Sequence, residues 1–187
     1  MVEMNAAISR PAQMKGSVKC KMDKRPEASK VIQALNIKKG ITVLDFGCGE
    51  GNYTIPVAEA VGGQGKVYAL DKEVDKLRQL EEKAEQKKLT NIKAILSEDE
   101  VDLDKDSVDI VLLFDVLHHI DNKQKLLNNL YNILKPDGLV SIFPHHHITR
   151  EELIKIVAQD GLFFLQDESP DEPLYNFKKG ERGYNGS

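Results

Sequence analysis

Three glycines, Gly47, Gly49 and Gly51, lie between a short apolar run rich in β-branched residues and a stretch with helical spacing. Glycine in such a turn tolerates a positive φ and allows a ligand to come close to the backbone. Asp71 ends the next apolar run, 20 residues after Gly51. A carboxylate at that place can accept hydrogen bonds from both hydroxyls of a ribose. The pattern therefore predicts a nucleoside-binding crevice.

The spacing of the glycines distinguishes between two kinds of nucleoside ligand. A dinucleotide fingerprint has the form G-x-G-x-x-G, whereas here Asn52 takes the third position and the extra glycine comes one residue early. Asp45 stands two residues before Gly47, where its charge would repel a pyrophosphate. It can instead order a loop that holds an amino-acid moiety bearing an ammonium group. A nicotinamide-dependent oxidoreductase is therefore kept only as an alternative.

Five histidines follow two further apolar runs, as His118-His119 and as 145–147. Histidine titrates near neutrality and can act as a general base, so His118, His119 and His145 are candidate catalytic residues. The alternatives are packing in a helical turn and lining of a substrate pocket. In an extended chain only His145 and His147 could converge, and no carboxylate or thiol is directly adjacent to them in sequence. We therefore expect no metal site.

The elements that must position these residues alternate along the chain. Short apolar runs with β-branched residues predict strands, and apolar residues at i, i+3 and i+4 predict helices. Pro26 is expected to open the first helix, Asp121 with Gln124 to cap a later one, and Thr149 with Glu152 to form a capping box. The expected strands are 41–46, 66–70, 92–96, 108–114, 139–143, 162–167 and 174–178, and the expected helices are 26–39, 53–61, 73–88, 121–135 and 149–161.

Strands that alternate with helices indicate a parallel sheet. The last two strands have no helix between them, so we expect them to pair antiparallel as a hairpin at one edge. The predicted fold class is α/β, a single Rossmann-like doubly wound sheet of about seven strands. Residues 26–187 would form this domain. Residues 1–25 are the only spare material near the mouth of the crevice and are predicted to form a lid.

The composition sets wider limits. The 187 residues are 41% hydrophobic and 30% charged, with a formal net charge of -4, as expected for one globular domain. The sequence has no apolar run long enough for a membrane span, and Met1–Arg10 lacks the apolar region of a signal peptide. We therefore expect a cytoplasmic protein in which Cys20 and Cys48 are free thiols. Cys48 could be reactive, but a small residue packed under the loop is the preferred interpretation.

The charge is unevenly distributed. Residues 1–40 carry nine Lys/Arg against three Asp/Glu, and residues 91–121 carry two Lys against nine Asp/Glu. A basic leader could touch an anionic ligand or RNA, and the alternative is a solvated segment. Aromatic residues do not interleave with the basic ones, so nucleic acid is not an expected partner. The acidic run 98–109 is expected to be a surface loop anchored by Val101 and Leu103.

Taken in order, these motifs closely resemble those of the class I S-adenosylmethionine-dependent methyltransferases. The resemblance begins with an acidic residue followed by G-x-G-x-G within 43–54 and includes Asp71 as a ribose-binding acid. It continues with residues 96–99, 107–120 and 134–140, and it covers about residues 26–178. The most similar subgroup is that of small-molecule enzymes such as those of menaquinone and ubiquinone biosynthesis.

The resemblance implies S-adenosyl-L-methionine as the cofactor and methyl transfer to a small-molecule acceptor by in-line displacement. A sulfonium is already a good leaving group, so alignment can suffice and no base is assigned. Ser97, Glu98 and Asp99 compete for the adenine contact. A non-catalytic cofactor-binding sensor or partner subunit is the main alternative. The implied cofactor-binding residues are Asp45, Gly47, Cys48, Gly49, Gly51, Asp71, Lys72, Ser97, Glu98 and Phe114.

Overall fold

A computed structural model describes residues 25–169 and 173–180 of the chain. The predicted lid over residues 1–25 lies outside these residues except for Arg25, and Cys20 lies outside them as well. Within the described residues, no helix is long and apolar enough to cross a lipid bilayer.

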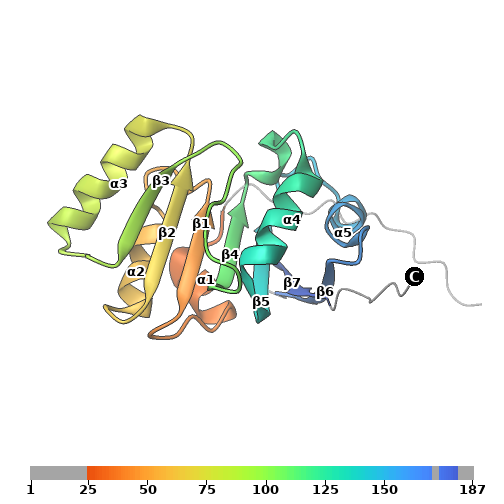
Figure 1. Cartoon of the computed structure of the whole chain (residues 1–187), viewed down its shortest axis with the longest axis horizontal. Coiled ribbons are helices and arrows are strands. Elements are labelled where there is room, and N and C mark those ends of the chain that lie inside the picture. Colours follow the sequence, from red (N-terminus) through yellow and green to blue (C-terminus); the bar gives the residue numbers. More distant parts are fainter. Residues whose placement is uncertain (1–24, 170–172, 181–187) are drawn as a thin grey trace, which may run out of the picture.

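Within residues 25–169 and 173–180, seven strands form one sheet in the order β3-β2-β1-β4-β5-β7-β6 (Figure 1). The five strands from β3 to β5 are parallel to one another. Strand β7 runs antiparallel to both β5 and β6, so the expected antiparallel hairpin at one edge is confirmed. The strands are β1 (Thr42–Phe46), β2 (Lys66–Asp71), β3 (Ile92–Leu96), β4 (Val108–Phe114), β5 (Leu134–Phe143), β6 (Phe163–Glu168) and β7 (Tyr175–Lys179).

Helices cover both faces of the sheet because successive strand residues point to opposite faces. Leu44 and Phe46 of β1 belong to a core with α4 and α5, whereas Val43 belongs to a core with α1 and α2. Helix α3 packs with α2 residues and the glycine loop in a third, smaller cluster. The helices are α1 (Ala28–Ala34), α2 (Thr54–Val61), α3 (Val74–Gln86), α4 (Lys123–Ile133) and α5 (Arg150–Ala158), with a 3-10 turn η1 (Leu117–His119). The fold is therefore a three-layer α/β sheet of Rossmann-like type, as expected.

Two of the residues predicted to open or cap a helix do not do so. Helix α1 begins at Ala28 rather than Pro26, and Pro26 instead accepts a hydrogen bond on its carbonyl oxygen from the Tyr53 hydroxyl at 2.7 Å. The cap of α4 is Asn122, whose side-chain oxygen accepts the Lys125 N–H at 2.9 Å, and Asp121 is therefore not the cap. Asparagine caps helices as well as aspartate does, so the sequence alone could not decide which of these two adjacent residues is the cap. The capping box of Thr149 and Glu152 is confirmed.

The residues between the predicted helix 121–135 and the predicted strand 139–143 lie inside β5. This strand starts at Leu134, and its pairing with β4 shifts register between Val108 and Ile110. Because Pro136 has no N–H to donate, an irregularity in the ladder is the expected place for it. Helix α4 accordingly ends at Ile133 instead of 135. The acidic loop before β4 is anchored as predicted, since Val101 and Leu103 pack partly buried against the core.

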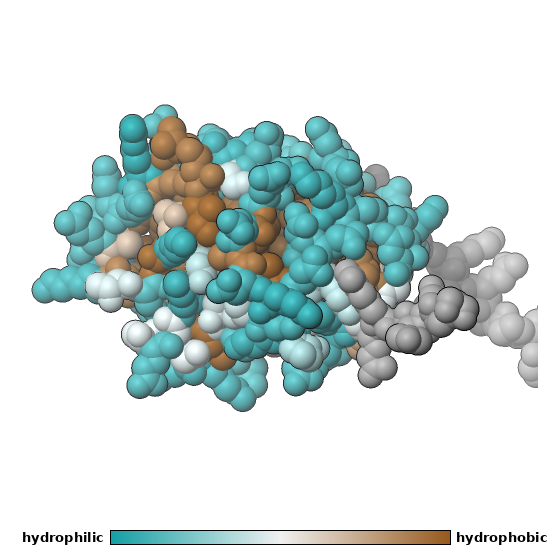
Figure 2. Space-filling model, viewed as in Figure 1, coloured by the Kyte–Doolittle hydropathy of each residue, from teal (hydrophilic) through white to brown (hydrophobic). Residues whose placement is uncertain are grey.

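The carboxyl ends of the parallel strands lie at the upper edge of the sheet in Figure 1. Two large apolar side chains are exposed near this edge, Val74 at the start of α3 and Leu96 at the end of β3. Figure 2 shows a mostly hydrophilic surface with apolar side chains gathered in the same region. In an open α/β sheet this edge is where ligands bind.

Candidate functional site

The loop between β1 and α2 is held against the end of β2. The backbone N–H groups of Gly47 and Cys48 both donate to the Leu70 carbonyl, at 2.7 and 3.0 Å. Gly47 has a φ of +77° and Gly49 a φ of +56°, a region that residues with a side chain rarely adopt. A Cβ atom on Gly49 would meet nothing nearer than 3.9 Å. The backbone at Gly49 is thus open on the side where a ligand could approach.

Asp71 joins the loop to the following helix. Its Oδ2 accepts the Gly49 N–H at 2.7 Å, and its Oδ1 accepts the Glu73 N–H at 2.9 Å. The residue is only 7% exposed, yet it lines a cavity of about 300 Å³ at the carboxyl ends of β1, β2 and β4. A carboxylate has about four lone-pair sites, so about two remain for a ligand. This is the place and the acceptor capacity expected for a ribose-binding acid.

Seven of the ten residues that the resemblance assigned to cofactor binding line this cavity. The set comprises Gly47, Gly49, Asp71, Lys72, Ser97, Glu98 and Phe114. At the rim, the Lys72 ammonium lies 3.4 Å from the Glu98 carboxylate. Phe114 is buried and packs edge-on against Tyr53, with ring centroids 4.8 Å apart. The residues that come from three strand ends and the glycine loop thus meet at one site.

Asp45, Cys48 and Gly51 lie behind the cavity wall. The Asp45 carboxylate is 2% exposed and accepts the Thr54 hydroxyl at 2.6 Å, which ties β1 to the first turn of α2. Burial raises the pKa of Asp45 to about 6. Asp45 therefore orders the loop, as the sequence suggested, without facing the cavity itself. A Cβ on Gly51 would lie 2.4 Å from Leu80 Cδ1, so this glycine is required for packing.

Cys48 is a buried free thiol that packs with residues of α2, β2 and α3. Burial is the main cause that raises the pKa of this thiol far above its usual range, and the Asp45 charge adds to it. A thiol that stays protonated is a poor nucleophile. The interpretation of Cys48 as a small packing residue therefore fits the structure better than that of a reactive thiol.

The sequence did not single out several residues that line the cavity. The Arg25 guanidinium donates to Asp115 Oδ2 at 2.7 Å across 90 residues of chain, and both residues line the cavity. Asp115 has a φ of +57°. The only sequence signal for this residue was its position directly after β4. Lys76, Val116 and Ile120 also line the cavity.

The histidines lie beside this wall. His119 lines the cavity. His118 stacks between the rings of His119 and His145, with ring centroids 3.8 and 4.2 Å away. Burial and the neighbouring histidines His119 and His145 lower the pKa of His118. Of the three candidate bases, only His119 is therefore placed to contact a bound ligand directly.

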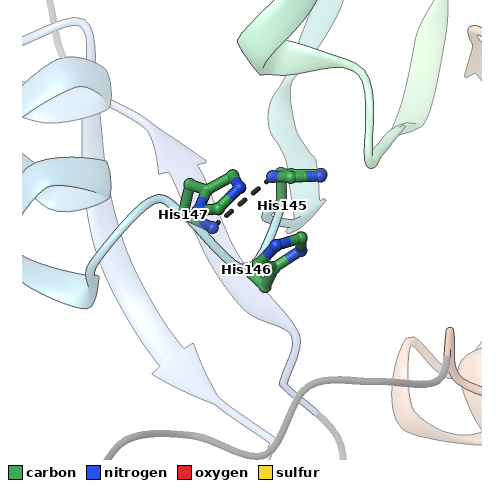
Figure 3. A group of neighbouring side chains, drawn as sticks. All are labelled: His145, His146 and His147. Atoms are coloured by element: carbon green, nitrogen blue, oxygen red, sulfur yellow. Dashed lines mark hydrogen bonds between the residues drawn. The ribbon is translucent and has the colours of Figure 1, made fainter.

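The expectation that only His145 and His147 could converge was wrong. One ring nitrogen from each of His145, His146 and His147 lies within 4.8 Å of the other two (Figure 3). The chain leaves the extended conformation after β5 and forms a turn, in which the Ile148 N–H donates to the His145 carbonyl at 2.9 Å. A turn brings consecutive side chains together, whereas an extended strand separates them.

A larger cavity of about 800 Å³ opens at the opposite end of the sheet. Its wall includes Asp109 and Lys135, which pair with each other at 2.8 Å. This cavity lies at the amino ends of the parallel strands, where no glycine loop reaches it. Position in the fold therefore favours the smaller cavity as the functional site.

The sheet carries a glycine loop after its first strand and an acid after its second, with a cavity between them. This arrangement is typical of α/β domains that bind a cofactor containing a nucleoside. The chain belongs to the family described as "Methyltransferase domain", whose model matches residues 37–176. A demethylmenaquinone methyltransferase of Geobacillus sp. (strain WCH70) is 32% identical over 110 residues. That alignment covers 58% of this chain and 47% of the relative.

Two further relatives extend the comparison. The (S)-coclaurine N-methyltransferase of Thalictrum flavum subsp. glaucum is 29% identical over 127 residues, which are 68% of this chain and 35% of that enzyme. A solved SAM-dependent methyltransferase from Aquifex aeolicus superposes with a TM-score of 0.70 at 24% identity, covering 81% of this chain and 88% of that one. The structural likeness confirms the fold. The chain spans about half the length, or less, of the curated relatives it matches.

Proposed function

We propose that this domain binds S-adenosyl-L-methionine in the cavity at the glycine loop and transfers its methyl group to a small-molecule acceptor. The observation that carries the proposal is the Asp71 carboxylate, which is anchored by Gly49 and Glu73 and still faces the cavity. Family membership supports the same chemistry. The bound cofactor would supply an electrophilic methyl on a sulfonium, which is a good leaving group.

The residues present fit this cofactor. Asp71 would accept the ribose hydroxyls, and the open backbone side of Gly49 leaves room for the ligand. Ser97 and Glu98 at the end of β3 would lie on the adenine side, and Phe114 would form an apolar wall. The part of the protein in the reaction is to align donor and acceptor and to exclude water, which is worth up to about 7–11 kcal/mol for well-oriented reactants.

The acceptor is proposed to be a small molecule because the relatives are named for demethylmenaquinone and for a nitrogen of coclaurine. His119 lines the cavity and is the histidine proposed to contact the acceptor. The predicted lid of residues 1–25 belongs to the same proposal, and so does the cytoplasmic location expected from the sequence. Limited proteolysis with and without cofactor tests the lid, and fractionation of native cells tests the location.

Two titrations separate this proposal from the alternatives. The purified protein is titrated calorimetrically with S-adenosylmethionine and, separately, with NADH. We expect saturable binding of the former alone, and binding of NADH alone would overturn the proposal in favour of an oxidoreductase. An acceptor screen then monitors release of S-adenosylhomocysteine, which a non-catalytic sensor or partner subunit would not produce.

A further inference from the structure

Beside the cavity, three side chains from two strand ends and a turn come close to one another. They are Asp115, directly after β4, His118 in η1, and His145, soon after β5. One ligand atom from each lies within 4.8 Å of the other two. None of the motifs that define the cofactor site requires this arrangement.

Two atoms of this group have no hydrogen-bond partner in the described part of the chain. Asp115 Oδ1 and His118 Nδ1 are both buried at the atom level and have no hydrogen-bond partner there. They face each other at 3.8 Å, which is too long for a hydrogen bond. Buried polar atoms without partners are rare in folded proteins and call for an explanation such as a bound ion.

The spacing suits a cation between them. Two ligand atoms at about 2.0–2.1 Å from a tetrahedral metal lie about 3.4 Å apart, so a shift of about 0.4 Å would bring Asp115 and His118 into this geometry. The other Asp115 oxygen is held by Arg25 at 2.7 Å, which turns Oδ1 toward His118. A fixed second oxygen of this kind is what orients a ligating carboxylate in metal sites.

We propose that Asp115, His118 and His145 form a binding site for a divalent transition-metal ion of the Zn²⁺ type. Two imidazoles and one carboxylate are a donor set that Zn²⁺ accepts with a coordination position left open. Asp115 also lines the cofactor cavity, so the open position would face a water, hydroxyl or thiol bound there. The metal site stands whether or not the domain transfers a methyl group.

The exposed histidines offer the competing site. His146 and His147 are exposed, and together with His145 they also group within 4.8 Å (Figure 3). The His145 Nδ1 presently accepts the His147 N–H at 3.4 Å, a weak bond that a metal at that nitrogen would replace. This run lacks a carboxylate, and its exposed rings are solvated. The buried group is therefore the favoured site, and the two share only His145.

To test the proposal, the full chain is first freed of metal and then titrated with Zn²⁺ in the presence of a chromophoric chelator that competes for the ion. We expect one equivalent to bind. His118→Ala and Asp115→Asn should each weaken binding at least about tenfold, because loss of an outer-shell partner alone costs about 10–100-fold. His146→Ala is the matched control and should leave the affinity within about twofold.

A second variant keeps the test valid if changes in the buried group prevent folding. The double substitution His146→Ala and His147→Ala removes the exposed imidazoles and leaves Asp115, His118 and His145 intact. Retention of one tightly bound equivalent, with the intense visible absorption of tetrahedral Co²⁺ upon substitution, supports the proposal. Failure of the unaltered chain to bind Zn²⁺, or loss of binding in the double variant, overturns it. Neither readout involves S-adenosylmethionine, so the result is independent of the proposed methyl transfer.

Discussion

The Asp71 carboxylate accepts the backbone N–H of Gly49 at 2.7 Å, although 22 residues separate them. The acid that follows β2 therefore fixes the loop that follows β1, and the same carboxylate faces the cavity. One residue thus has a structural and a ligand-binding task. Its substitution should affect both, and the two effects can be measured separately.

Asp71→Ala should lower the affinity for S-adenosylmethionine at least about tenfold, because hydrogen bonds to a charged group contribute about 1.5–3 kcal/mol each. The melting temperature should fall as well, since the N–H groups of Gly49 and Glu73 lose their acceptor. Asp71→Asn is the matched control and should retain more stability, because its amide oxygen still accepts one N–H. Calorimetric titration and thermal unfolding measure the two effects. Unchanged affinity in Asp71→Ala would show that another acid holds the ribose.

Gly49→Val should abolish cofactor binding. The φ of +56° penalises a side chain by about 1–3 kcal/mol, and the added methyl groups would occupy the open space beside the cavity. Gly40 also has a positive φ, +86°, with open space around it and no part in the cavity wall. Gly40→Val should therefore lower the melting temperature and leave binding intact. Equal binding by both variants would exclude the glycine loop as the cofactor cradle.

Gly51→Ala tests packing at the same loop. The new Cβ would meet Leu80 Cδ1 at 2.4 Å in a position with a φ of +88°. We expect a loss of about 1–3 kcal/mol in the free energy of unfolding, larger than for Gly49→Ala, where a Cβ has room. Urea unfolding of the two variants measures the difference. A Gly51→Ala protein as stable as the parent would refute the packing role.

Asp45 should make the stability depend on pH. Burial raises its pKa to about 6, above the unfolded value of about 3.9, so the folded state binds a proton that the unfolded chain releases. The contribution of Asp45 to stability is therefore present below about pH 4 and is lost as the pH rises to about 6, by up to about 3 kcal/mol. Asp45→Asn should remove this dependence.

The measurement is urea unfolding of the parent and of Asp45→Asn at several pH values between about 4 and 7. The parent should lose stability relative to the variant over this interval. Asp102→Asn, in the exposed part of the acidic loop, controls for the loss of one charge. Parallel stability curves for the parent and Asp45→Asn would contradict the assignment.

Local patterns predicted the strands that carry the site. The bounds of β3 and β4 match the predicted ranges 92–96 and 108–114, because each is a short run rich in apolar and β-branched residues with polar residues on both sides. Asp71 was found for the same reason, since a lone acid at the end of such a run is conspicuous. The resemblance then supplied the residues at the other strand ends, of which Ser97, Glu98 and Phe114 reach the cavity.

Contacts between distant segments could not be predicted. Arg25 meets Asp115 only because the sheet brings the start of α1 beside the end of β4, and no local pattern encodes that approach. The histidines converge because the chain forms a turn after β5. The apolar run of the strand does not predict that turn. Likewise, no local pattern showed that the Asp45 carboxylate is buried and accepts the Thr54 hydroxyl.

The insertion of β7 between β5 and β6 has a consequence for biosynthesis. Strand β5 is complete at Phe143, but its neighbour on the open side is the last strand of the sheet and ends at Lys179. Until the ribosome has released that strand, the outer edge of β5 presents unpaired N–H and C=O groups to other nascent chains. The strands that form the cofactor crevice precede this vulnerable interval. Chains truncated before Leu174 would therefore retain the crevice motifs and be prone to aggregation.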